Sequence, residues 1–233
     1  MAMELSVVAF IDVLGFSAMV KADAAGQCVK YLDAFREVLE EVKSAFPEVD
    51  GGLDAKMFSD SIVLAAPLSP DAVIEVLKAC ANLQRRFLRR GILLRGGVSY
   101  GKHYADSTVM FSEGLISAYH IESQLAKYPR IVVDKNVIDY FVNHSDVHDD
   151  KLQMGRGLLI QDRDKVSFVH YLSGEEFPGD TAHVEQVITT QLKSGEAVLE
   201  KLRWLHDYHV FCADSYGQPK IDAPDWFQRM QSH

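Results

Sequence analysis

Cysteine pairs, long hydrophobic runs and an excess of basic residues are all missing from this sequence. Its three cysteines, Cys28, Cys80 and Cys212, are odd in number and far apart, which is typical of reduced thiols in a cytoplasmic protein. The apolar run near the N-terminus follows no basic residue and stops at Asp12, so we expect neither a signal peptide nor a membrane span. These absences favour a cytoplasmic protein that makes no contact with a membrane.

Positive charge is scarce as well. Asp and Glu outnumber Lys and Arg by 33 to 24, which gives a formal net charge of -9. Binding to duplex nucleic acid requires a basic surface, so this composition argues against a nucleic-acid partner. Arginines cluster once, at Arg85, Arg86, Arg89 and Arg90, within a predicted helix. We interpret that cluster as a solvated helix face rather than as a phosphate-binding patch.

Apolar residues are abundant, and their spacing predicts a definite order of elements. Hydrophobic residues make up 48% of the 233 residues, enough for a sizeable core. The patterns predict, in order, a strand at 7–12, a helix at 24–45, a hairpin of 53–58 and 62–66, a helix at 71–90 and a strand at 93–101. This is the ferredoxin-like split unit of the α+β class, a twisted sheet with helices on one face.

The pattern is weaker beyond residue 101. We expect a helix at 114–126, a short strand at 130–133, a helix at 135–142 and a polar loop at 143–151. A strand pair at 158–160 and 166–171 and one long helix at 181–208 complete the expected elements. The chain is therefore predicted to be one domain with a C-terminal extension.

Two carboxylates carry the strongest indication of chemistry. Asp12 ends the first apolar strand, and Asp60 lies at the tip of the predicted hairpin. In the ferredoxin-like order the first and third strands are antiparallel neighbours, so these two residues should lie close together. Paired carboxylates suit Mg²⁺ or Mn²⁺ and phosphoryl or nucleotidyl transfer. A helix-cap or turn role is the ordinary alternative for each residue alone, and a salt link that locks either one inside the protein would count against a metal site.

Two further features lie near the same predicted sheet edge. The turn from Val13 through Leu14, Gly15 and Phe16 to Ser17 would, if it leads into a helix, present backbone N–H groups to phosphates. Arg95 precedes a glycine pair on the strand at 93–101, where either a contact with phosphate or base or a surface ion pair fits.

These segments together resemble the catalytic domain of class III nucleotidyl cyclases, and within that class the bacterial pyrimidine cyclases of the Pycsar anti-phage system. The resemblance covers about residues 7–138 and rests on the order and spacing of FIDVLGFS, KMFSDSIV, LLRGGVSYGKHY and MFSEGLISAYHIESQLAKYPRIVVDKNVI. It implies a nucleotidyl cyclase catalytic core at residues 1–142, with residues 143–233 as a C-terminal strand pair and helical extension of the same domain.

The resemblance also implies a reaction and a set of partners. The ribose 3′-hydroxyl of a nucleoside triphosphate attacks the α-phosphate, giving a 3′,5′-cyclic nucleotide and pyrophosphate. Two divalent ions, Mn²⁺ or Mg²⁺, would be held at Asp12, Val13 and Asp60, with Arg95 as a catalytic residue and residues 13–17 binding substrate. Family members are homodimers with active sites between protomers, and the cyclic nucleotide would activate a separate effector.

At four positions this sequence can be compared with the adenylate-type members of the family. Adenylate-type members carry an Asn and an Arg at the places that Ile116 and His120 take here. Of the pair that reads a purine base, Lys56 is kept and Val109 replaces the acidic residue. The loss at Val109 puts ATP and GTP in doubt, so we expect UTP, with CTP as the near rival, and count Lys56 and His120 among the substrate-binding residues. The missing Asn and Arg weaken the stabilisation of the transition state and favour a competing class. The competing class is a non-catalytic module that binds nucleotide or serves as a dimerisation scaffold.

Overall fold

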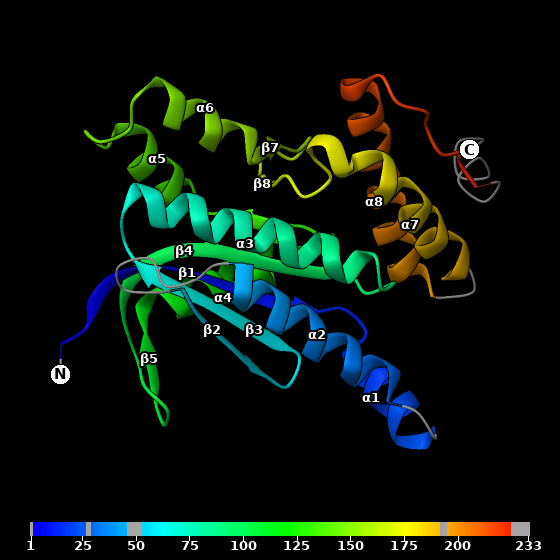
Figure 1. The fold of residues 1–233 in the computed structure, drawn as a ribbon, viewed down its shortest axis with the longest axis horizontal. Helices are drawn as coiled ribbons and strands as arrows, with labels where there is room; N and C mark the ends of the chain where they lie inside the picture. Colours follow the sequence, from blue (N-terminus) through cyan, green and yellow to red (C-terminus); the bar gives the residue numbers. More distant parts are fainter. Residues whose placement is uncertain (1, 27–28, 46–52, 192–194, 225–233) are drawn as a thin grey trace.

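An eight-stranded mixed sheet forms the centre of the computed structural model, which describes residues 2–26, 29–45, 53–191 and 195–224. Its strands follow the order β2-β3-β1-β4-β6-β8-β7, and β5 pairs with β4 at the side (Figure 1). The strands are β1 (Glu4–Val13), β2 (Asp54–Phe58), β3 (Ser61–Pro67), β4 (Leu94–Ala105), β5 (Met110–Ser112), β6 (Ile131–Val133), β7 (Leu159–Gln161) and β8 (Ser167–Val169).

Helices lie on both faces of this sheet. They are α1 (Phe16–Ala25), α2 (Lys30–Ala45), α3 (Pro70–Leu88), α4 (Glu113–Leu125), α5 (Lys135–Asn143), α6 (Asp149–Gly157), α7 (Phe177–Thr190) and α8 (Glu196–Tyr216), with a 3₁₀ turn at Gly174–Glu176. Alternate residues of β1 show the division, because Val7, Ala9 and Ile11 pack with α2 and α3, whereas Val8 packs with Leu115 of α4.

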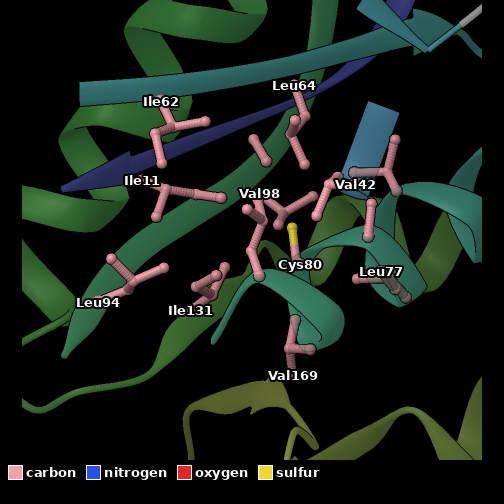
Figure 2. Packing of buried hydrophobic residues seen from close by; sticks show 14 of the residues in the cluster. Ile11, Val42, Ile62, Leu64, Leu77, Cys80, Leu94, Val98, Ile131 and Val169 are labelled. Carbon is pink, nitrogen blue, oxygen red and sulfur yellow. The ribbon is translucent and has the colours of Figure 1, made fainter. Parts of the chain in front are cut away.

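The predicted ferredoxin-like α+β order is confirmed. Strand β1 lies between β3 and β4 and pairs with both in antiparallel fashion. The main core fills the space between these strands and α3, where Ile11, Ile62, Leu64 and Val98 of the sheet meet Cys80 of the helix (Figure 2). All five of these side chains are fully buried. Helices α2 and α3 lie on one face of the sheet, as predicted for the ferredoxin-like unit. Helix α4, which follows that unit, covers part of the opposite face.

Two glycines of β4 allow α4 to lie directly on the sheet. A Cβ atom on Gly97 would come 2.3 Å from the carbonyl oxygen of Ala118, and one on Gly101 would come 2.7 Å from the backbone nitrogen of Gly114. Both obstacles are backbone atoms of α4 and cannot move aside as a flexible side chain could. The distance between α4 and the sheet is therefore set by the absence of side chains at these positions.

The prediction of a single helix at 24–45 is wrong. The structure has two helices, α1 and α2, and the second begins beside the carboxylate of Asp23, whose Oδ2 accepts the backbone N–H groups of Tyr31 and Leu32, each at 2.9 Å. A carboxylate at these free N–H groups starts a new helix because it satisfies donors that have no helical partner. Cys28 lies outside the described residues.

The expectations for the C-terminal region are only partly right. The strand pair is present as β7 and β8, and it extends the sheet next to β6. Helix α6 begins at Asp149, within the polar loop expected at 143–151, and the single helix expected at 181–208 is replaced by α7 and α8. These two helices pack on each other and on the sheet, so each buries an apolar face that one straight helix could not.

The interpretation of the arginine cluster as a solvated face is also wrong. The Nε atoms of Arg85 and Arg89 lie 2.8 and 2.7 Å from the carboxylate oxygens of Asp180, a fully buried residue of α7. Arg86 and Arg90 pair with glutamates of α2. Helices that are distant in sequence supply these acids, and the cluster fastens α2 and α7 to α3.

The two described cysteines, Cys80 and Cys212, are free thiols, as expected for a reduced protein. Both are buried, and burial raises the pKa of the Cys212 thiol to about 12. Across the described part of the chain, every helix is too short or too polar to cross a bilayer.

His170 joins the end of β8 to α8. Its Nδ1 atom lies 2.8 Å from the hydroxyl of Tyr208, and its Nε2 atom lies 2.9 Å from the hydroxyl of Tyr216. A neutral imidazole has one donor and one acceptor, which matches two hydroxyl partners. Burial lowers the pKa of His170 to about 4, so the ring stays neutral in the folded chain at mildly acidic pH.

We expect Gly97→Ala to lower the free energy of unfolding by about 1–3 kcal/mol, the usual cost of forcing an extra methyl group into a packed core. The reason is the close approach of Ala118 described above. Gly157→Ala serves as the matched control, because a Cβ atom there would meet nothing within 4 Å and alanine favours a helix. Urea unfolding of both variants measures the difference, and equal stabilities would contradict the prediction.

We expect the protein to lose stability as the pH falls from about 6.5 to about 4. An unfolded chain protonates His170 near pH 6.5, whereas the folded chain resists protonation down to about 4, so acid favours the unfolded state across this window. The contribution of one such histidine is on the order of 3 kcal/mol. Urea midpoints measured along this pH range should fall less steeply for His170→Gln than for the wild type.

Candidate functional site

The pairing of β1 with β3 brings Asp12 and Asp60 together, as the ferredoxin-like order predicts. Asp12 lies opposite Ser61 in the register, and the backbone N–H of Val13 donates to the carbonyl oxygen of Asp60 at 2.9 Å. Val13 itself is buried. The end of β1 is therefore fixed against the β2–β3 turn by its own backbone hydrogen bond.

The turn after β1 leads into a helix. The N–H of Leu14 donates to the carbonyl oxygen of Leu93 at 2.9 Å, and Gly15 takes a left-handed conformation with φ of 81° directly before α1. The N–H groups of Phe16 and Ser17 have no carbonyl ahead of them in the helix, whereas the N–H of Ala18 already donates to the carbonyl oxygen of Gly15 at 3.0 Å. Phe16 packs its ring on Phe35 at 5.7 Å and acts as a core contact, while Ser17 is exposed.

Arg95 lies directly across from Asp12 in the pairing of β1 with β4. Its Nε atom donates to Oδ2 of Asp12 at 2.9 Å, and its Nη2 atom lies 2.8 Å from Oε1 of Glu122 in α4. Within the described residues, the Nη1 atom of Arg95 has no hydrogen-bond partner, and 30% of the side chain is exposed. One edge of the guanidinium thus binds two carboxylates while another edge remains available to solvent.

Glu122 is the buried member of this group. Only 4% of its side chain is exposed, against 20% for Asp12. Burial raises the pKa of Glu122; Arg95 opposes that rise, and the nearby charges of Asp12 and Asp60 add to it. Asp12, Asp60 and Glu122 therefore form an acidic cluster, in which Asp12 and Glu122 contact the guanidinium of Arg95 and the charge of Asp60 acts on Glu122.

The donor set fits a hard divalent cation. Arg95 pairs with Asp12 and Glu122, and Asp60 adds a third carboxylate, which leaves the cluster with an excess of negative charge that a divalent cation would balance. Asp12 and Asp60 supply the few oxygen ligands that Mg²⁺ or Mn²⁺ takes from a protein when water and phosphate complete the shell. In the described residues, no group of three or more His, Cys, Asp or Glu side chains could hold a metal ion, so the candidate side-chain ligands are Asp12 and Asp60 alone.

The ion pair between Asp12 and Arg95 is the kind of salt link that would count against a metal site. Its geometry is open on one side, because Asp12 stays partly exposed and only its Oδ2 atom binds Arg95. A partly exposed ion pair is screened by water and loses less than a fully buried pair when its partner is exchanged for another charge. The pair therefore competes with a cation at Asp12 without sealing the carboxylate inside the protein.

Lys56 and His120 are not brought to this acidic cluster within one chain. The Nζ atom of Lys56 donates to the carbonyl oxygen of Asp106 at 2.9 Å and lies 3.1 Å from Asp54. His120 is exposed on α4, two positions before Glu122 and thus on a different side of the helix.

Sequence reasoning assigned no role to Glu122. The buried stripe of α4 is Gly114, Ala118 and Glu122, spaced four residues apart, so a carboxylate continues a row of small residues. This spacing could have indicated a role for Glu122, because a charge on the buried side of a helix needs a partner.

Arg130 was also missed. It is fully buried after Pro129, and its guanidinium binds Asp162, Asp164 and the carbonyl oxygen of Leu125 at the end of α4. The acidic turn between β7 and β8 is thus the partner of a buried arginine, and it fastens the C-terminal strands to the helix that carries Glu122.

No protein-family model matches the sequence, and no curated protein matches it. Among solved structures, the chain is similar to a bacterial light-regulated adenylyl cyclase, with a TM-score of 0.46 and 12% identity over 79% of this chain and 98% of that one. It is also similar to the adenylyl cyclase CyaB from P. aeruginosa, with a TM-score of 0.45 and 14% identity over 72% and 94% of the two chains.

A third similar structure is an adenylate/guanylate cyclase/hydrolase from Silicibacter pomeroyi, with a TM-score of 0.46 and 15% identity over 72% and 96% of the two chains. At these scores and identities the similarities decide neither the reaction nor the substrate of this chain, which have to be judged from its own residues.

Proposed function

We propose that this protein is a nucleotide cyclase that converts UTP to 3′,5′-cyclic UMP and pyrophosphate. The observation that carries the proposal is the meeting of Asp12, Asp60 and Arg95 beside a helix-starting turn, at the end of the central strand. Acidic oxygens for cations and donors for phosphates thus lie within one small region. This combination suits a reaction at the phosphates of a nucleotide.

In the proposed reaction the ribose 3′-oxygen forms a bond to the α-phosphorus, the bond from that phosphorus to the bridging oxygen breaks, and the hydroxyl proton is released. Two Mn²⁺ or Mg²⁺ ions, held by Asp12, Asp60 and the backbone of Val13, would supply activation of the hydroxyl and neutralisation of phosphate charge. Arg95 would direct its available donor edge at phosphate oxygens, and the first turn of α1 would direct N–H groups at them.

We assign a pyrimidine base because the side chains that would read a purine base are missing or engaged elsewhere. Val109 offers no polar group where purine-reading relatives of the resembled family carry an acid, and Lys56 is already engaged by Asp106 and Asp54. A smaller pyrimidine base suits this altered site, with CTP as the alternative to UTP. By the same resemblance, we propose that cyclic UMP signals during anti-phage defence to a separate effector protein.

A homodimer would complete the site. Strand β5 and helix α4 are consecutive and expose large apolar side chains, with exposed fractions of 69% for Phe111 and 59% for Ile116. Apolar patches of this kind commonly form protein interfaces. A second copy packed here would bring His120 of one protomer toward the acidic cluster of the other. Residues 143–233 are proposed to be an extension of the same domain as residues 1–142.

The non-catalytic nucleotide-binding module remains the second candidate, because Asp12 is held by Arg95 and no Asn or Arg stands at positions 116 and 120. The two candidates differ in turnover, since a module would bind a triphosphate and form no product.

We expect the full chain to form cyclic UMP from UTP with Mn²⁺, and more slowly from CTP than from UTP. Asp12→Ala and Asp60→Ala should each lower kcat at least about a hundredfold, the scale on which loss of one charged group at a phosphoryl or acyl transition state acts. Chromatography of the products from each of the four triphosphates measures this. Binding of UTP without turnover by the wild type would instead establish the non-catalytic module.

We expect Ile116→Asp to convert the dimer to monomers and to abolish turnover, because a charge would be buried at the centre of the proposed interface. Phe211→Asp is the matched control, since Phe211 is a similarly exposed apolar residue on α8. Sedimentation measures the oligomeric state. Mixing Asp12→Ala chains with His120→Ala chains should restore part of the activity if each site draws on both protomers.

A further inference from the structure

Arg95 is bound by two carboxylates in different surroundings. Its register opposite Asp12 is fixed by the pairing of β1 with β4, and its contact with Glu122 is fixed by the close approach of α4 to Gly97. Nε donates a hydrogen bond to Asp12, whereas Nη2 forms an ion pair with Oε1 of Glu122, a buried atom that accepts no hydrogen bond from the described residues. These two nitrogens form one edge of the guanidinium, so the edge that could hold a single carboxylate at two points is divided between two carboxylates.

The two carboxylates differ in what they lose if Arg95 leaves. The side chain of Glu122 is almost completely buried in α4, whereas one fifth of the Asp12 side chain is exposed. A buried carboxylate that loses its only cation pays a large desolvation cost, but an exposed one exchanges its partner for water or another cation. Arg95 is therefore held more firmly by Glu122 than by Asp12.

We propose that Glu122 is a positioning residue, which retains Arg95 so that Asp12 can exchange the guanidinium for a divalent cation. The inference rests on the proposed function. While Nη2 is paired with Glu122, Arg95 donates to Asp12 through Nε alone, and Oδ1 of Asp12 accepts no hydrogen bond from it. Without the Glu122 charge, both nitrogens would turn to Asp12 in a two-point pair that opposes the cation. Glu122 also keeps the exposed edge of Arg95 on the side from which phosphates would approach.

The test measures Mn²⁺ binding to the full chain by electron paramagnetic resonance, together with kcat and KM for UTP. Glu122→Gln should weaken Mn²⁺ binding about tenfold, the lower end of what loss of a group behind a metal ligand costs, and Glu122→Asp should recover most of it. Glu40→Gln is the matched control, because Glu40 also pairs with an arginine but is 71% exposed on α2. Thermal unfolding verifies that each variant is folded.

An Arg95→Gln background separates positioning from the simple loss of a nearby negative charge. If Glu122 acts through Arg95, adding Glu122→Gln to Arg95→Gln should change Mn²⁺ affinity less than about twofold, since coupled residues are not additive. Wild-type affinity in Glu122→Gln, or an undiminished tenfold loss in the Arg95→Gln background, would overturn the proposal. If Glu122→Gln does not fold, Glu122→Leu takes its place under the same two criteria, because an apolar side chain removes the charge and suits a buried position.

Failure of this inference is distinct from failure of the proposed function. A wild type that binds Mn²⁺ through Asp12 and turns over no triphosphate would refute the proposed cyclase activity. The Mn²⁺ titrations would still test whether Glu122 positions Arg95. Equal Mn²⁺ binding by the wild type and Asp12→Asn would refute the exchange at Asp12, and with it this inference.

Discussion

The central position of β1 is the constraint on which the site depends. A strand that pairs on both sides cannot shift its register without breaking two ladders of hydrogen bonds, and each shift by one residue would move buried side chains to the other face. The register places Asp12 opposite both Ser61 and Arg95. Backbone pairing alone therefore places Asp12 and Arg95 next to each other, and the side-chain contacts add to this placement.

The electrostatics of the site follow from this placement. Two of the three carboxylates share one guanidinium, and the more deeply buried of these two, Glu122, has a raised pKa because of its burial. An imbalance of this kind is unfavourable for the isolated folded chain and favourable for a chain that binds cations. The structure thus combines a costly arrangement of charges with an open side through which ligands could compensate it.

The C-terminal region supports the same site from outside the ferredoxin-like unit. Leu14, in the turn before α1, packs against the apolar cluster formed mainly by α7, α8 and β8. The carbonyl oxygen of Arg130 accepts the N–H of Gly96, next to Arg95, while its guanidinium is held by the acidic turn between β7 and β8. Changes in this region would therefore reach both strands that carry the acidic cluster and its arginine.

The sequence by itself determined the α+β class, the ferredoxin-like order and the neighbourhood of Asp12 and Asp60, because apolar periodicity and strand order are local properties that survive without coordinates. Only the tertiary structure decided that Glu122 completes the cluster, that Arg85 and Arg89 hold a buried Asp180, and that the last long helical stretch is two helices. These features depend on which side of a helix meets a distant element. The spacing of residues along the chain shows which side of a helix they share, but it does not show which distant element that side contacts.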